Sequence, residues 1–117
     1  MAVTIDEMAA HLRGLRAKSQ ARADARALQI RSRLPAAKRL LQERHHARRV
    51  VLFGSFARGE TTERSDVDLA VEGLDPAGYF TAIADLMGLL DAPVDLVEIE
   101  RAPASLLARL AIEGIDL

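Results

Sequence analysis

The sequence predicts one small α/β domain of the α+β type, in which a mixed sheet of about three strands is packed by helices. Three short runs are uniformly apolar or alternate with a period of two, as strands do, at residues 50–53, 66–71 and 94–99. Longer stretches around them carry apolar residues at helical spacing. The chain has 117 residues, half of them hydrophobic, which leaves room for one packed domain and little more.

The first helix is expected to begin at Thr4, because Thr4 and Glu7 have the spacing of a capping box. Apolar residues then recur at helical intervals: Ile5, Met8, Leu12, Leu15, Ala23, Ala27, Ile30 and Leu34. Pro35 lacks a backbone N–H, so we expect a break or kink there and a second helix directly after it. This point divides the chain into a basic N-terminal helical extension, residues 1–34, and a domain of residues 35–117.

The remaining elements follow in order along the chain. They are a buried strand over 50–53, a polar turn-like stretch over 56–65, a strand over 66–71, a loop over 73–78, an amphipathic helix over 79–90, a strand over 94–99 and a closing helix from Ala104. His45 and His46 precede the first strand, and we expect them at the solvated end of a helix.

Composition excludes several classes of protein. The chain has no cysteine, which excludes disulfide scaffolds, zinc–thiolate sites and cysteine nucleophiles. No apolar run approaches the roughly 18–20 residues that span a bilayer, and the N-terminal residues do not have the pattern of a secretory signal, so we expect a cytoplasmic protein with no membrane contact. One Tyr, three Phe and no Trp offer few surfaces for base stacking, which disfavours direct nucleic-acid binding.

Charge is divided unevenly along the chain, although the formal net charge is only −1. Residues 1–49 hold 12 Lys and Arg against 4 Asp and Glu, a net charge of +8, whereas residues 50–117 hold 4 against 13, a net charge of −9. An arginine-rich helix is most often a solvated face, but ten Arg in the first part favour contact with a partner. Three alternatives stay open for this helix: it could pack against its own chain, pair with a second copy of the chain or bind another protein.

Carboxylates at strand spacing are the strongest chemical signal. Asp66 and Asp68 are two residues apart in a predicted strand, so their side chains point to the same face. If the third strand is a neighbour of the second, Asp95 joins them. Three carboxylates crowded on one face repel one another unless a cation lies between them. Such oxygen-rich clusters suit Mg²⁺ with substrate phosphates, and two ions can clamp the attacking and leaving oxygens in phosphoryl transfer.

The turn that ends the first strand is suited to binding phosphate. Gly54 lets the backbone approach a ligand closely, and the Ser55 hydroxyl with the following amides can donate hydrogen bonds. Arg58 is placed to add a charge-assisted contact, although an exposed turn residue is an equally good interpretation. Together with the carboxylates, these residues form apparatus for phosphoryl or nucleotidyl transfer.

Three motifs with this spacing resemble the minimal nucleotidyltransferase family of the DNA polymerase β-like superfamily. They are Gly54–Glu60 (GSFARGE), Arg64–Leu69 (RSDVDL) and Val94–Val97 (VDLV). The resemblance covers about residues 36–117 and implies the nucleotidyltransferase fold, with the N-terminal helix as an addition to it.

The resemblance also implies a role for each motif residue. Asp66 and Asp68 would be Mg²⁺ ligands. Asp95 would be the third catalytic carboxylate, which coordinates the catalytic ion and helps to activate the acceptor. Gly54 and Ser55 would form the triphosphate-binding turn.

The activity that the resemblance implies is transfer of AMP from ATP to a hydroxyl, with two Mg²⁺ ions and release of pyrophosphate. Small members of the family often resemble antitoxins encoded beside a HEPN-domain ribonuclease toxin, which they neutralise by attaching AMP to a toxin tyrosine. Two alternatives stay open. The chain could be a non-catalytic antitoxin that blocks its partner through the basic helix, or a homodimeric nucleotidyltransferase that acts on a small molecule.

Overall fold

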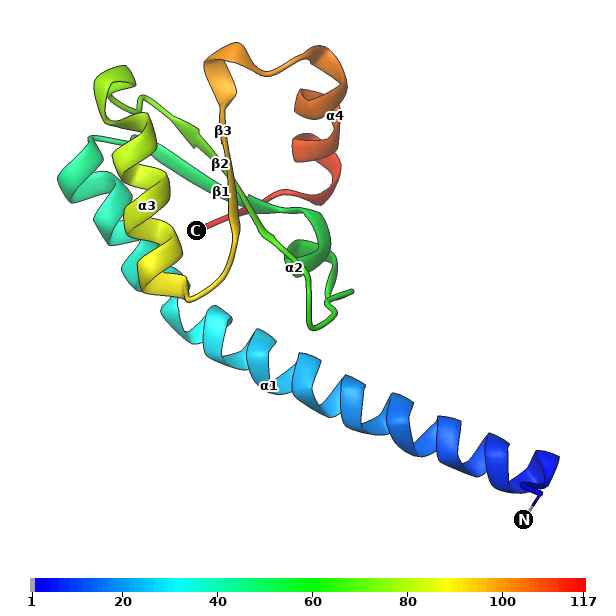
Figure 1. The fold of residues 1–117 in the computed structure, drawn as a ribbon. Coiled ribbons are helices and arrows are strands. Elements are labelled where there is room, and N and C mark those ends of the chain that lie inside the picture. The colour runs from blue at the N-terminus through cyan, green and yellow to red at the C-terminus, as the bar shows by residue number, and fades with distance from the viewer. Residues whose placement is uncertain (1) are drawn as a thin grey trace.

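The computed structural model describes residues 2–117 and contains a four-stranded mixed sheet with helices on both faces (Figure 1). In chain order the elements are α1 (Ile5–His45), β1 (Arg49–Phe53), α2 (Gly54–Arg58), β2 (Val67–Glu72), α3 (Tyr79–Leu90), β3 (Val94–Glu98), α4 (Ala104–Glu113) and β4 (Ile115–Asp116), with 3₁₀ turns at Pro76–Gly78 and Ile99–Arg101. The predicted α/β class and its three main strands are confirmed. The sequence analysis missed α2 and β4, which have five and two residues and so carry almost no periodic signal.

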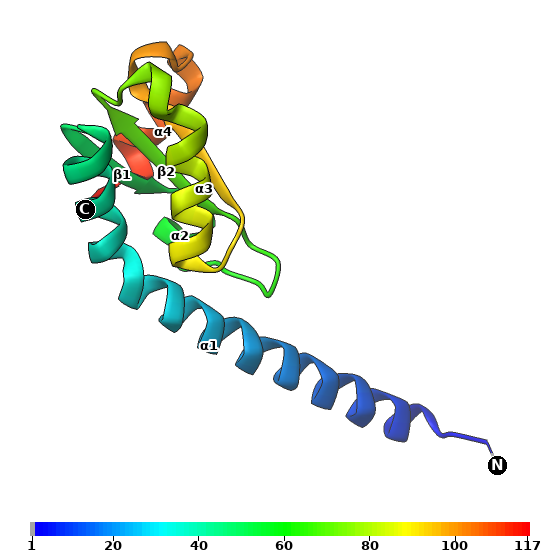
Figure 2. The same ribbon diagram turned by 60° about the vertical axis from the view of Figure 1, so that its left-hand side comes forward.

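The strand order is β3-β2-β1-β4, with β1 antiparallel to β2 and β4, and β2 parallel to β3. Helix α3 makes the crossover between the parallel strands and lies with α1 on one face of the sheet, while α4 covers the other face (Figures 1 and 2). Strand residues alternate between the two faces. In β1, Leu52 packs in the main core under α1 and α3, and Val51 and Phe53 pack in a smaller cluster with Leu106 and Leu110 of α4.

Helix α1 is a single helix of 41 residues that runs through Pro35, so the expected division into two helices is wrong, although its axis bends along the cyan stretch (Figures 1 and 2). A proline inside a helix costs about 3 kcal/mol. The side chains around it are buried: Ile30 and Leu34 before it, and Ala37 and Leu41 after it. Burial of each large side chain stabilises the fold by about 1.5–3 kcal/mol, which offsets the cost of the proline. The predicted capping box at its start is confirmed.

Only the second half of α1 packs on the sheet. Its first buried residue is Ala23, and the preceding turns project from the body, which gives the molecule principal extents of 63 × 29 × 20 Å (Figures 1 and 2). The projecting part carries an apolar stripe whose members are exposed: Ile5, Met8, Leu12 and Leu15. Within residues 2–117, no helix is long and apolar enough to cross a membrane.

The end of α1 differs from the expectation for His45. This side chain is buried, and its Nε2 lies 2.9 Å from Oδ2 of Asp85 on α3. His46 adopts the left-handed conformation that ends the helix and is exposed. The prediction of a solvated position therefore holds for His46 and is wrong for His45, because α3 packs beside the last turn of α1, a contact that local sequence does not reveal.

Candidate functional site

Two of the three candidate aspartates are paired in the sheet. Asp68 of β2 and Asp95 of β3 are direct register partners, and Phe53 of β1 lies opposite Asp68 on its other side. Residues in direct register point to the same face, so both carboxylates lie on the face that α4 covers. The sequence analysis made this pairing conditional on the two strands being neighbours, and the parallel pairing of β2 with β3 fulfils that condition.

Asp66 lies in the loop just before β2 and is exposed, whereas the sequence analysis placed it inside the strand. Pairing with β3 begins one residue later, where the Val67 amide donates to the Pro93 carbonyl at 2.9 Å. Asp66 nevertheless stays electrostatically close to the pair, because its charge contributes to the pKa of Asp68.

The environment of Asp68 is unfavourable for an isolated negative charge. Burial raises the pKa of the Asp68 carboxyl above its usual range, and the charges of Asp95 and Asp66 raise it further. Arg109 and Arg58 act in the opposite direction but do not offset these effects. A cation in contact with the carboxylates would relieve the repulsion.

Within residues 2–117, no group of three or more His, Cys, Asp or Glu side chains is arranged so that it could hold a metal ion by itself. Magnesium in nucleotide-dependent enzymes is held by one or two carboxylates together with substrate phosphates and water. The register pair, Asp68 and Asp95, supplies two carboxylates of this kind on one face. The donor set therefore fits a magnesium–nucleotide complex.

Gly54 brings the predicted phosphate turn against the carboxylates. It follows the last residue of β1 and has a φ of +72°, in the left-handed region that favours glycine. A Cβ atom at this position would collide with the carboxylate of Asp68. Ser55 is the next residue, so the turn and the carboxylates form one continuous surface at the end of β1.

Glu113, at the end of α4, contacts both groups that the sequence analysis assigned to phosphate. Its Oε1 accepts from the Gly54 amide at 3.3 Å, and its Oε2 accepts from the Arg58 guanidinium at 2.9 Å. The Arg109 guanidinium also donates to Oε1 of Glu113, at 3.1 Å. The Arg58 guanidinium donates to the Glu60 carboxylate as well, at 3.1 Å. These contacts, with the Arg58 hydrogen bond as the largest cause, keep the pKa of Glu113 below its usual range.

Sequence reasoning missed Glu113, because 59 residues separate it from Gly54 and no spacing rule connects them. The Gly54 amide and the Arg58 guanidinium both donate to the Glu113 carboxylate. A triphosphate that binds to these two donors must therefore compete with Glu113.

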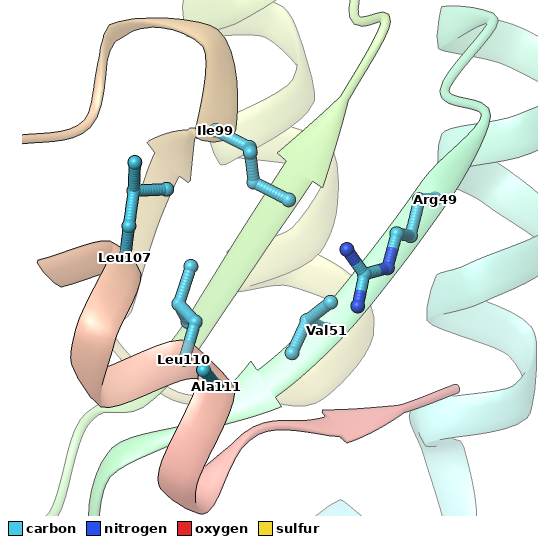
Figure 3. Close-up of a pocket in the computed structure, with 6 residues that line it drawn as sticks. All are labelled: Arg49, Val51, Ile99, Leu107, Leu110 and Ala111. Atoms are coloured by element: carbon cyan, nitrogen blue, oxygen red, sulfur yellow. The ribbon is translucent and has the colours of Figure 1, made fainter. Parts of the chain in front are cut away.

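A cavity of about 170 Å³ lies on the same face of the sheet, between β1 and α4 (Figure 3). Its lining is mostly apolar: Arg49, Val51, Ile99, Leu107, Leu110 and Ala111. This cavity is lined by residues other than the candidate site residues. Asp95 is exposed on the edge strand β3, whereas Asp68 on the interior strand β2 is half-buried and Gly54 is buried.

Residues 36–117 match the family described as Polymerase beta, Nucleotidyltransferase. The chain belongs to this nucleotidyltransferase family. It is 48% identical over 72 residues to protein adenylyltransferase MntA of Thermococcus cleftensis, an alignment that covers 59% of this chain and 73% of that protein. It is also 39% identical over 72 residues to a protein of Methanocaldococcus jannaschii named as a candidate protein adenylyltransferase, covering 59% of this chain and 74% of the relative.

Solved structures with this fold agree with the assignment. A candidate minimal nucleotidyltransferase superposes with a TM-score of 0.68 at 34% identity, covering 78% of this chain and 95% of that one. A toxin–antitoxin complex crystallised with AMP-PNP contains a chain that superposes with a TM-score of 0.61 at 29% identity. The superposition covers 67% of this chain and 66% of that one, so this chain spans about two thirds of its length. The family match begins within α1, and the first 35 residues lie outside it.

Proposed function

We propose that this nucleotidyltransferase transfers AMP from ATP to a tyrosine hydroxyl of a partner HEPN-type ribonuclease toxin, and thereby acts as an antitoxin. The observation that carries the proposal is the register pair of Asp68 and Asp95 beside the Gly54 turn. Relatives named protein adenylyltransferases and the toxin–antitoxin structure with AMP-PNP support it.

The proposed reaction is a displacement at the α-phosphorus of ATP. The acceptor oxygen forms a bond to that phosphorus, the bond to the bridging oxygen of the β-phosphate breaks, pyrophosphate leaves, and the acceptor hydroxyl loses its proton. Gly54, Ser55 and Arg58 would bind the triphosphate through the backbone amide, the hydroxyl and the guanidinium. Displacing Glu113 from two of these donors would be part of nucleotide binding.

The aspartates would have a different role, which is to hold the metal ions. Asp66, Asp68 and Asp95 would hold two Mg²⁺ ions, which when bound neutralise triphosphate charge and lower the pKa of the acceptor hydroxyl. Asp95 is exposed on the edge strand, where a hydroxyl from a second protein can approach. Positioning and electrostatics would supply most of the acceleration.

The test is an incubation of the chain with α-labelled ATP, Mg²⁺ and the protein encoded beside it. We expect label on that protein, mapped by mass spectrometry to a tyrosine, and loss of label in the Asp68→Asn and Asp95→Asn variants. An unlabelled neighbour would overturn the proposal.

The same incubation separates the two alternatives. A neighbour that is neutralised equally well by the aspartate variants would favour occlusion without catalysis. Label on a small hydroxyl compound in the absence of any partner, together with a dimer in solution, would favour a homodimeric enzyme for a small molecule.

A further inference from the structure

Two arginines of α1 contact the segment that joins α2 to β2, residues 59–66, and a third contacts α2 itself. The Arg22 Nε lies 2.7 Å from Oε1 of Glu63. The Arg26 guanidinium donates to the Ser65 carbonyl at 2.9 Å and to the Thr62 carbonyl at 3.4 Å. These side chains are one helical turn apart and so lie on one face of the helix.

The third arginine, Arg31, contacts Phe56 in α2, just before this segment. Its guanidinium donates to the Phe56 carbonyl at 2.7 Å and lies 5.6 Å from the centre of the Phe56 ring. Phe56 is buried in the main core, so this contact joins α1 to α2 at a fixed point. The arginines therefore hold α2 and the second half of the segment, residues 62–65, against α1.

The segment has little regular structure of its own. A turn over residues 62–65 is closed by the Thr62 amide donating to the Ser65 hydroxyl at 2.8 Å and by the Ser65 amide donating to the Thr62 carbonyl at 3.3 Å. These bonds are within the turn and do not tie it to the rest of the domain. The bonds from α1 do so, and Arg26 acts on the carbonyl of the peptide that joins Ser65 to Asp66.

We propose that Arg26 is a positioning residue of the transfer site, which fixes Asp66 relative to Asp68 by holding the Ser65 carbonyl. This inference rests on the proposed function. Asp66 lies between two anchored backbone groups: the Ser65 carbonyl, which Arg26 holds, and the Val67 amide, which donates to the Pro93 carbonyl at 2.9 Å. Arg26 is half-buried, and the helix that carries it is anchored by the buried side chains of Ala23 and Ala27.

The placement of Arg26 also explains part of the charge of the N-terminal segment. Arg22, Arg26 and Arg31 all lie before residue 36, outside the part of the chain that matches the family. Their partners are one carboxylate and three backbone carbonyls of the matched part. Arg22 and Arg26 therefore connect the basic helix to the loop that precedes Asp66.

Amide hydrogen exchange of the apo protein tests the positioning without any catalytic reaction. In Arg26→Ala we expect exchange of the amides in residues 62–68 to become about tenfold faster, since a hydrogen bond from a charged donor is lost and the loop opens locally. Arg26→Lys retains the charge and should restore most of the protection. Arg16→Ala is the matched control, because Arg16 is exposed on the projecting part of the same helix. Unchanged exchange in Arg26→Ala would overturn the proposal, whatever the activity of the protein.

Transfer kinetics with Mg²⁺ and ATP then separate positioning from simple stabilisation. We expect kcat to fall about ten- to hundredfold in Arg26→Ala while KM for ATP changes less than about threefold, since the triphosphate turn at Gly54 stays in place. Equal changes in both parameters, or recovery at a temperature further below the midpoint of unfolding, would indicate a purely structural role. An inactive wild-type protein with the expected exchange pattern would refute the proposed function and leave the positioning intact.

Exchanging the charges of Arg22 and Glu63 provides a second test if the Arg26→Ala variant does not fold. Arg22→Glu and Glu63→Arg should each speed up exchange in residues 62–68, and the double variant should slow it again, because the ion pair is rebuilt with reversed signs. A double variant that exchanges as fast as the two single variants would contradict the assignment of α1 as the support of this loop.

Discussion

Asp68 and Asp95 face each other across the parallel pair β2 and β3, with their carboxylates on one face of the sheet. Neighbouring strands lie about 4.8 Å apart, so two ionised carboxylates in this arrangement repel strongly. Such a pair weakens the fold in the absence of a cation. Repulsion between the two carboxylates lowers the stability of the fold, and we expect this loss at a site that binds a cation during the reaction.

Asp68→Asn and Asp95→Asn should each lower transfer of AMP at least about 100-fold, because each removes a carboxylate expected to hold Mg²⁺. Asp91→Asn is the control, since Asp91 is exposed at the end of α3 and its positive φ of 50° suits asparagine. The measurement is transfer of label from ATP. Activity within twofold of wild type in both site variants would contradict their assignment.

Asp68→Asn should also leave the apo protein at least as stable as wild type at pH 7. The pKa of Asp68 is raised in the folded state, so the group contributes stability below its ordinary pKa and loses it as the pH rises through the raised value. At neutral pH the ionised carboxyl therefore opposes folding, and asparagine removes this effect. Thermal unfolding at pH 7 and pH 4 checks the sign: the variant gains relative to wild type at the higher pH.

Gly54→Ala should destabilise the protein much more than Gly59→Ala. Both glycines have a φ near +70°, which costs an alanine roughly 1–2 kcal/mol. A Cβ at Gly59 meets open space, whereas a Cβ at Gly54 collides with Asp68. Urea unfolding measures the difference, and the loss of activity should follow the same order. Equal unfolding free energies for the two variants would refute the close contact between Gly54 and Asp68.

Removal of residues 1–15 should leave the domain folded, whereas removal of residues 1–34 should not. The shorter deletion takes away exposed turns of α1, but the longer one also removes Ile30 and Leu34 from the main core, together with the three α1 arginines that contact α2 and the loop after it. These two results would move the boundary between extension and domain from residue 34 to near residue 22. Circular dichroism and thermal unfolding of the two truncated proteins test this, and a cooperative transition in the longer deletion would contradict it.

Glu113→Gln should lower stability at pH 7 and lose this effect in acid. The pKa of Glu113 is lowered by Arg58, by the Gly54 amide and by Arg109, so its contribution is present above its ordinary pKa of 4.5 and disappears as the pH falls through the lowered value. The difference in Tm between wild type and variant should therefore shrink from pH 6 to pH 3. The same variant should bind ATP at least as tightly as wild type, since a neutral amide competes less well with phosphate for Arg58.

Most of the fold follows from patterns that a single sequence contains. Alternation identifies β2 and β3, and the capping box identifies the start of α1. The errors arise where tertiary packing overrides a local rule. Pro35 is tolerated because the helix on both sides of it is buried, and His45 is buried because α3 supplies Asp85.

In the candidate site, too, some features follow from local patterns in the sequence and others do not. Strand periodicity predicts that Asp68 and Asp95 are on polar faces of their strands, but their pairing could be stated only on the condition that β2 and β3 are neighbours, which periodicity does not determine. Glu113 and Arg26 could not be predicted, since each acts on a backbone group far away in the sequence. No pattern in a chain records which carbonyl an arginine will reach.

The alternation along β3 has a consequence for errors in folding. Leu96 is buried in the main core because its neighbour Asp95 points to the opposite face. A slip of β3 by one residue would turn Asp95 into the apolar layer and expose Leu96, so the Asp68–Asp95 pairing and the burial of Leu96 would be lost together. A molecule in which Leu96 is buried in the main core therefore also has the Asp95 carboxylate on the opposite face, beside Asp68.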